Sequence, residues 1–162
     1  MIHTFLFCGL RRSELLLLQV SDVDLNKNQL TVRAETSKSK ITRHLPIHPT
    51  LRLHILEYLK ERKLCKKTTQ YLLIGHGGDE RFTAHGLKHW VKRISELSGV
   101  KFHVHRFRHT FATNLAYSNV GATKIQKLMG HKSLSMTEKY LRSVEPEDLS
   151  EDVNMLSIEN LA

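Results

Sequence analysis

The sequence predicts a mainly α-helical domain with one small antiparallel β-sheet, an α+β fold. Apolar residues recur at helical spacing through most of the chain, whereas two short segments in its first third alternate between apolar and polar residues. A length of 162 residues with 40% hydrophobic residues suits one globular domain that can bury a sizeable core. The sequence contains neither an internal repeat nor a low-complexity linker. We therefore expect residues 1–162 to form a single domain.

Two short helices are predicted at the start of the chain. The apolar stretch from Met1 to Phe7 is typical of the end of a helix, which stops near Gly9. Ser13 then begins a second helix through a run of leucines, and this helix ends by Asp22.

A β-hairpin is predicted next. The alternation Leu-Thr-Val-Arg-Ala-Glu indicates a strand over Leu30–Glu35, and a second strand is expected over Ile41–Ile47. The polar residues 36–40 between them place lysines at the tip of the hairpin.

The rest of the chain is predicted to be largely helical. Apolar spacing predicts an amphipathic helix over Thr50–Lys63, and Thr83 can cap another that runs to about Leu97. Between them, Gln70–Ile74 is expected to be a short strand or an extended segment. Further helices are expected over roughly His105–Tyr117, Ala122–Met129 and Ser135–Leu141, with a last one from about Pro146.

Charge is distributed unevenly along the chain. All 25 lysines and arginines lie at or before Arg142 together with 10 of the 16 acidic residues, so this body carries a net charge of +15. Residues 143–162 hold the other six acidic residues and form an acidic tail, predicted to be helical. A strongly basic body favours a polyanionic partner, most simply nucleic acid. The tail could dock on its own domain, on a neighbouring copy, or nowhere.

The composition also excludes several classes of protein. Cys8 and Cys65 are far apart and outside any CxxC pair, which argues against a disulfide framework or a cysteine zinc site. No apolar run approaches the roughly 20 residues of a membrane span, and the apolar N-terminus lacks a basic leader. We expect a cytoplasmic protein that does not contact a membrane.

A set of ionisable side chains in the last third of the chain points to chemistry on an anionic group. His105 and Arg108 are three residues apart and share one helix face. Gly130 lets the chain leave a helix just before His131, and Tyr140 follows nine residues later. Two imidazoles, a guanidinium and a phenol could thus converge on one anionic group.

These residues resemble the signature of the tyrosine recombinases, the family of the phage integrases and the Xer and Cre recombinases. That signature is an H-x-x-R box, a later Gly-His or Gly-Trp, and a tyrosine about nine residues on. The segment Gly9-Leu10-Arg11-Arg12-Ser13-Glu14-Leu15 is similar to the family's first arginine box, and Lys38-Ser39-Lys40 to its lysine turn. The resemblance implies six catalytic residues with Glu14 in support of the first: Arg11, Lys38, His105, Arg108, His131 and Tyr140.

The resemblance also implies a mechanism. Tyr140 would attack a DNA phosphate to form a 3′-phosphotyrosyl link, while the two arginines and His131 hold the phosphate oxygens. His105 would take or share the phenol proton, and Lys38 would protonate the departing 5′ oxygen. Neither a metal nor another cofactor is expected, because cationic side chains supply the charge. The partner would be double-stranded DNA, and the protein would work at the nucleoid.

Two features of the family lie outside these motifs, an N-terminal domain and the role of the C-terminal tail. Family members usually carry an N-terminal core-binding domain that grips DNA, and we expect it to be absent because only ten residues precede Arg11. The domain would then be an N-terminally truncated catalytic domain, either a piece of a longer protein or a reduced gene. The tail would join copies into a tetramer on DNA, as the corresponding segment often does in the family.

Three other interpretations compete with this one. His105 and His109 stand at i, i+4 as in zinc proteases, but the flanking arginines and the missing glutamate argue against zinc. His109 is then expected to be a buried or supporting residue, and Lys40 competes with Lys38 for the lysine position. A catalytically reduced DNA-binding relic or regulator on the same fold is the main functional alternative. An unrelated basic RNA-binding protein is the other.

Overall fold

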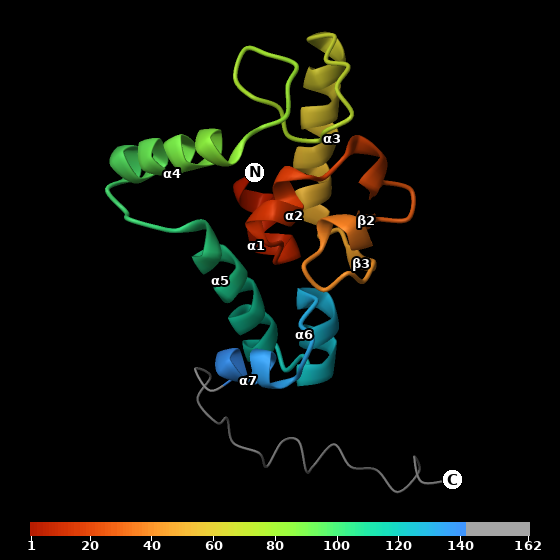
Figure 1. Ribbon diagram of the computed structural model, residues 1–162, viewed down its shortest axis with the longest axis vertical. Helices are drawn as coiled ribbons and strands as arrows, with labels where there is room; N and C mark the ends of the chain where they lie inside the picture. Colours follow the sequence, from red (N-terminus) through yellow and green to blue (C-terminus); the bar gives the residue numbers. More distant parts are fainter. Residues whose placement is uncertain (142–162) are drawn as a thin grey trace, which may run out of the picture.

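The computed structural model describes residues 1–141 and confirms a mainly helical fold with a small antiparallel sheet (Figure 1). Two short 3-10 turns, Val20–Asp22 and Ala34–Thr36, flank the sheet strands. The helices are α1 (Ile2–Cys8), α2 (Arg12–Leu16), α3 (Pro49–Leu64), α4 (Ala84–Ser98), α5 (Val104–Tyr117), α6 (Ala122–Met129) and α7 (Ser135–Leu141). The strands are β1 (Val23–Asp24), β2 (Gln29–Val32) and β3 (Arg43–Pro46).

The predicted hairpin is present, but its strands are shorter than expected. Strands β2 and β3 pair antiparallel, with Leu30 opposite Leu45. The prediction that β2 reaches Glu35 is wrong, because Arg33 turns away to bind Asp22 and residues 34–36 form a 3-10 turn. The second strand begins at Arg43 rather than at Ile41, whose side chain is exposed outside the ladder.

One further strand belongs to the sheet, and one predicted segment lies outside it. Strand β1 was not predicted, because two residues are too few to show an alternation; it pairs with β2 and makes the sheet three-stranded. The segment Gln70–Ile74 is extended and makes only isolated bridges, Tyr71 with Gln19 and Ile74 with Arg81, in the described part of the chain.

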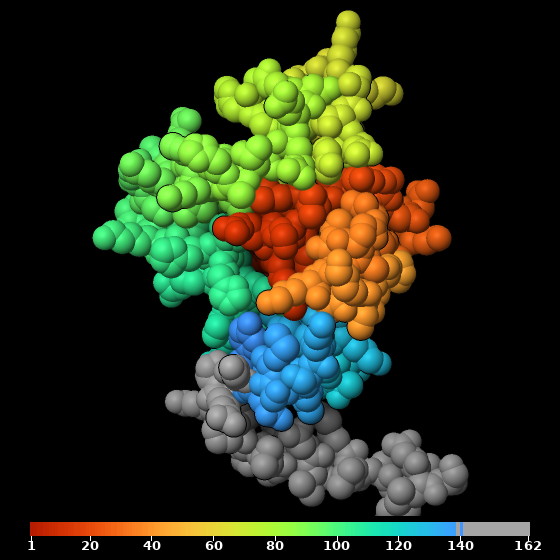
Figure 2. Space-filling model, viewed as in Figure 1, coloured from red at the N-terminus to blue at the C-terminus, as the bar shows by residue number. Residues whose placement is uncertain are grey.

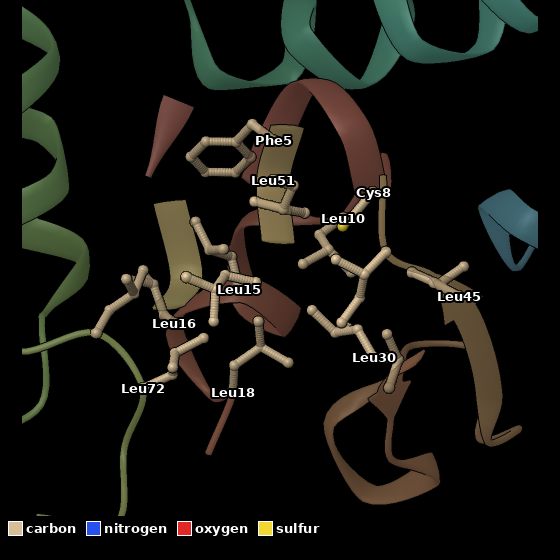
Figure 3. Close-up of a cluster of buried hydrophobic side chains, with 14 of the residues drawn as sticks. Phe5, Cys8, Leu10, Leu15, Leu16, Leu18, Leu30, Leu45, Leu51 and Leu72 are labelled. Carbon is tan, nitrogen blue, oxygen red and sulfur yellow. The ribbon is translucent and has the colours of Figure 1, made fainter. Parts of the chain in front are cut away.

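The main hydrophobic core lies between α1, α2, α3 and the sheet (Figure 3). Phe5 at one end and Leu30 at the other have no exposed surface, and Leu15 of α2 lies between them. The leucine run that predicted α2 is thus buried on several sides. As a result Arg11, at the N-terminus of α2, is held at the edge of a rigid core.

A second, smaller apolar cluster joins the three C-terminal helices. Ala112 of α5 and Ile125 and Met129 of α6 are fully buried, and Tyr140 of α7 packs on them. Helix α5 also packs against α1, so it connects the two clusters. Figure 1 shows α6 and α7 below the red N-terminal segment and the orange hairpin.

Two further predictions concern the end of the chain and the possibility of a membrane span. The helix expected from Pro146 lies outside the described residues. Within residues 1–141, none of the helices has the length and apolar content that crossing a membrane requires.

Candidate active site

One cleft brings together four of the six predicted site residues. It has a volume of about 550 Å³ and lies between α2, the turn before β3, α4 and α5. Its lining includes Arg11, Lys38, His105 and Arg108. In Figure 2, viewed as in Figure 1, the red N-terminal segment is set back between the green helices and the orange hairpin. Residues almost a hundred positions apart therefore face one cavity.

Arg11 is held from two sides at the start of α2. Its Nη1 donates to Glu14 Oε1 at 2.9 Å, and its Nη2 donates to the carbonyl oxygen of Gly130 at 3.0 Å. The backbone N–H of Arg11 donates to the other carboxylate oxygen of Glu14 at 2.8 Å, which caps the helix. The side chain keeps 19% of its surface exposed, so the guanidinium is fixed yet reachable from the cleft.

Glu14 is a fully buried carboxylate that also binds a residue the sequence analysis did not single out. Arg43 of β3 donates from Nη1 to Oε1 at 3.0 Å and from Nη2 to Oε2 at 2.8 Å. Burial by itself would raise the pKa of Glu14, but the hydrogen bonds and charge of Arg43 and the hydrogen bonds of Arg11 outweigh it and lower the pKa to about 2. Glu14 is therefore ionised at neutral pH.

Arg108 points from α5 toward the ends of two other helices. Its Nη1 donates to the carbonyl oxygen of Gly9, and its Nη2 donates to that of Met129 at 2.5 Å. Burial, and then the nearby charge of Arg11, lower the pKa of Arg108 to about 10, so it stays cationic at neutral pH. A second guanidinium thus stands beside the first.

His131 lies directly after the left-handed turn predicted at Gly130. Gly130 has φ of 63°, and the backbone N–H of His131 donates to the carbonyl of Gln126 at 3.1 Å, as in a Schellman motif. The buried ring places Nδ1 2.9 Å from the hydroxyl of Thr137. Burial, followed by the charges of Arg108 and Arg11, lowers the pKa of His131 to about 4. The ring is therefore neutral at neutral pH.

Tyr140 lies next to His131 and close to the arginines. Its ring stacks on His131, with the ring centroids 5.7 Å apart, and meets the ring of His109 edge-on at 5.0 Å. The charge of Arg108 interacts with the Tyr140 phenol, which places the two groups within electrostatic range. Tyr140 thus packs on His131, and the two residues before His131, Met129 and Gly130, bind the guanidinium groups of Arg108 and Arg11.

The remaining predicted side chains are exposed in or near the cleft. Lys38 and His105 both line it, whereas Lys40 is absent from its lining. His109 was expected to be buried or supporting, and it is not buried: its ring is exposed and packs against Tyr140. His105 and His109 therefore face different neighbours although they lie one turn apart.

Two residues of this network escaped the sequence analysis. Arg43 lies at every second position with Leu45 and Ile47, and all three side chains are buried. This spacing does indicate that the arginine of β3 faces inward. Thr137 is fully buried beneath His131, and nothing in its sequence context indicates this contact. The four predicted side chains that line the cleft make it cationic, so that it can bind an anionic group. His131 and Tyr140 are absent from its lining and stack on each other.

Comparisons with known proteins agree with this arrangement. Residues 1–146 match the model of the phage integrase family. Tyrosine recombinase XerC of Alcanivorax borkumensis is 33% identical over 136 residues, which are 82% of this chain and 43% of that protein. Tyrosine recombinase XerA of Thermococcus kodakarensis is 34% identical over 136 residues, covering 83% and 46%. The chain spans a little less than half the length of these relatives.

Solved structures share the fold. A crystal structure of XerA recombinase superposes with a TM-score of 0.77 at 24% identity, over 94% of this chain and 54% of that one. The XerH site-specific recombinase, bound to a palindromic difH substrate in a post-cleavage complex, gives 0.74 at 24% identity, over 95% and 44%. The catalytic-domain fold predicted from the motifs is thereby confirmed.

The variant His131→Gln should make stability less dependent on pH between 6.5 and 4. Because the pKa of His131 is lowered by folding, the unfolded chain takes up the proton first, so stability is complete above pH 6.5 and falls as pH drops toward 4. In urea titrations the parent chain should lose up to about 3 kcal/mol more than His131→Gln over this window. His85→Gln, at an exposed position of α4, is the control. Parallel curves for the parent chain and His131→Gln would contradict the prediction.

Proposed function

This chain belongs to the phage integrase family, and we propose that residues 1–162 are the catalytic domain of a site-specific DNA recombinase. It would cut and rejoin double-stranded DNA by transesterification, with Tyr140 as the nucleophile. The observation that carries the proposal is the cleft shared by Arg11, Lys38, His105 and Arg108, next to which Tyr140 stacks on His131.

The arginines would hold the scissile phosphate. A phosphodiester resists attack because its own charge repels nucleophiles, and charge on its non-bridging oxygens grows on the way to the pentacoordinate state. The hydrogen bonds that fix Arg11 use two of its five N–H donors, so others can face the cleft. Arg108 adds a second charge, and neutral His131 can donate one N–H. Each preorganised contact of this kind contributes about 3–4 kcal/mol to a transition state.

Other side chains would accept and donate the protons that move when one phosphate bond replaces another. The Tyr140 oxygen would form a bond to phosphorus while the bond to the 5′ oxygen breaks. The phenol proton would pass to a histidine, for which we propose His105, and Lys38 would give a proton to the departing 5′ oxygen. The products are a 3′-phosphotyrosyl link and a free 5′-hydroxyl, and attack by a DNA hydroxyl reverses the step.

This chemistry needs no ATP, because the phosphotyrosyl bond conserves the energy of the broken phosphodiester. It needs no divalent metal either, because two guanidinium groups and a lysine supply the positive charge that a metal supplies in many nucleases. The basic body of the chain suits a DNA duplex as the partner. We accordingly place the protein in the cytoplasm, at the nucleoid.

Replacing Tyr140 with Phe should abolish covalent capture of DNA. The substrate is a library of duplexes with randomised sequence, each nicked so that the short 5′-hydroxyl strand diffuses away after cleavage and traps the adduct. The parent chain should form a denaturant-resistant adduct in a chelator and without ATP, and Tyr140→Phe should form none. Tyr117→Phe, at an exposed tyrosine of α5, should behave like the parent.

The outcomes of that experiment separate the alternatives. Salt-sensitive DNA binding by the parent chain without any adduct would favour a DNA-binding relic or regulator. Preferential binding of RNA would favour an unrelated RNA-binding protein. An adduct that persists in Tyr140→Phe would assign the nucleophile to another residue.

Replacing Lys38 with Met should slow cleavage by about 100-fold, in keeping with the loss of a general acid. A substrate whose bridging 5′ oxygen is sulfur should remove most of this defect, because a thiolate leaves without a proton. Lys40→Met, on the same turn but outside the lining of the cleft, is the matched control and should cleave normally. A defect in Lys40→Met that the sulfur substrate relieves would transfer the role to Lys40.

We also propose that copies assemble on DNA, with a tetramer as the complete form, through the acidic tail. The tail sequence after Pro146 has apolar residues at helical spacing, including Leu149, Val153 and Leu156. The described part of the chain offers an apolar groove of about 630 Å³ between α1, β3 and α5. A chain that ends at residue 142 should still form the adduct but give smaller complexes with DNA by light scattering. Complexes of unchanged mass would contradict the proposal.

A further inference from the structure

We propose that Arg43 is a positioning residue for the cleavage step, which sets Arg11 in place through Glu14. This inference rests on the proposed function and goes beyond the six residues of the motif. Arg43 does not line the cleft and only 8% of its side chain is exposed, so it cannot hold the phosphate itself. It can affect the reaction only through the groups to which it is hydrogen-bonded.

The first partner is the carboxylate of Glu14. Arg43 donates to both carboxylate oxygens, at 3.0 and 2.8 Å, in the two-pronged geometry that only a guanidinium offers. The same two oxygens accept the side chain and the backbone N–H of Arg11. Arg43 therefore fixes the plane of the carboxylate, and the carboxylate in turn fixes the guanidinium of Arg11.

The second partner is the C-terminal end of α6. Arg43 Nε donates to the carbonyl oxygen of Leu128 at 3.1 Å. Two residues later, the carbonyl oxygen of Gly130 accepts Arg11 Nη2 at 3.0 Å. The contacts form a closed ring from Arg43 through Glu14 to Arg11, and back through Gly130 and Leu128. Arg11 is thereby positioned from both sides by groups that Arg43 holds.

The close approach of Gly130 supports this arrangement. A β-carbon at residue 130 would lie 2.9 Å from Arg43 Nη1, so a larger residue would push the guanidinium away. The glycine that turns the chain toward His131 thus also makes room for Arg43. Strand β3, which follows the turn of Lys38, is tied by the same side chain to α2 and α6.

Two substitutions test the inference. Arg43→Met keeps the length of the side chain, and Arg43→Lys keeps its charge but cannot hold both oxygens of Glu14 at once. Arg33→Met is the matched control, because Arg33 pairs with buried Asp22 at 2.9 Å and donates to the carbonyl of Leu17, away from Arg11. Thermal melts show which variants fold. If Arg43→Met does not fold, Arg43→Lys decides the result.

The measurement is the single-turnover rate of adduct formation on the best-cleaved duplex of the library, with an ordinary phosphodiester or an uncharged methylphosphonate at the scissile position. A misplaced Arg11 matters most when the phosphate is charged. We expect Arg43→Met to slow the ordinary substrate by about 100-fold, the scale of one lost oxyanion contact, and the methylphosphonate by less than about 10-fold. Arg11→Ala should show the same pattern, whereas Arg33→Met and Lys38→Met should not. DNA concentrations for half-saturation should stay within about threefold.

Each alternative outcome is distinct. A folded Arg43→Lys with the parent rate overturns the inference. So does an equal loss on both substrates, which assigns Arg43 a role in folding alone. In both cases the parent chain still forms its Tyr140 adduct, so the proposed function stands. If the parent chain forms no adduct, the proposed function fails and the inference falls with it.

Discussion

The site depends on one buried carboxylate. Glu14 has no exposed surface, and an ionised group in that position is tolerated only when charges and hydrogen bonds replace its lost hydration. Arg11 and Arg43 supply both, from α2 and from β3. A helix and a strand that are adjacent in the core are thereby locked in one relative position. The same bonds keep Glu14 ionised and hold a guanidinium at the cleft.

Helix ends provide the second set of constraints. The carbonyl groups at a helix C-terminus have no partner within the helix and carry partial negative charge. Helices α1 and α6 both end at left-handed glycines, Gly9 and Gly130, and carbonyl groups there bind Arg108 and Arg11. The glycines allow the chain to turn while these carbonyls stay aimed at the guanidinium groups. These bonds hold the guanidinium groups of Arg11 and Arg108 together at the cleft.

The site divides into fixed and accessible parts. Arg108 and His131 are buried and bound to the framework, which suits groups that must meet a developing charge without rearranging. Lys38 and His105 are exposed at the cleft, which suits groups that exchange protons with a bound substrate. Burial also keeps His131 neutral among cations, so it can donate a hydrogen bond without adding to their mutual repulsion.

The sequence by itself determined the family, the helical class and the identity of the candidate site residues, because these follow from side-chain chemistry at fixed spacings. The predicted ends of the strands were wrong, because Arg33 leaves the β-sheet to bind Asp22, eleven residues earlier in the chain. Only the tertiary structure decided that Arg43 binds Glu14 and that His109 meets Tyr140. Contacts of this kind join distant segments through a shared core. The local spacing of apolar residues does not determine which distant segments the core brings together.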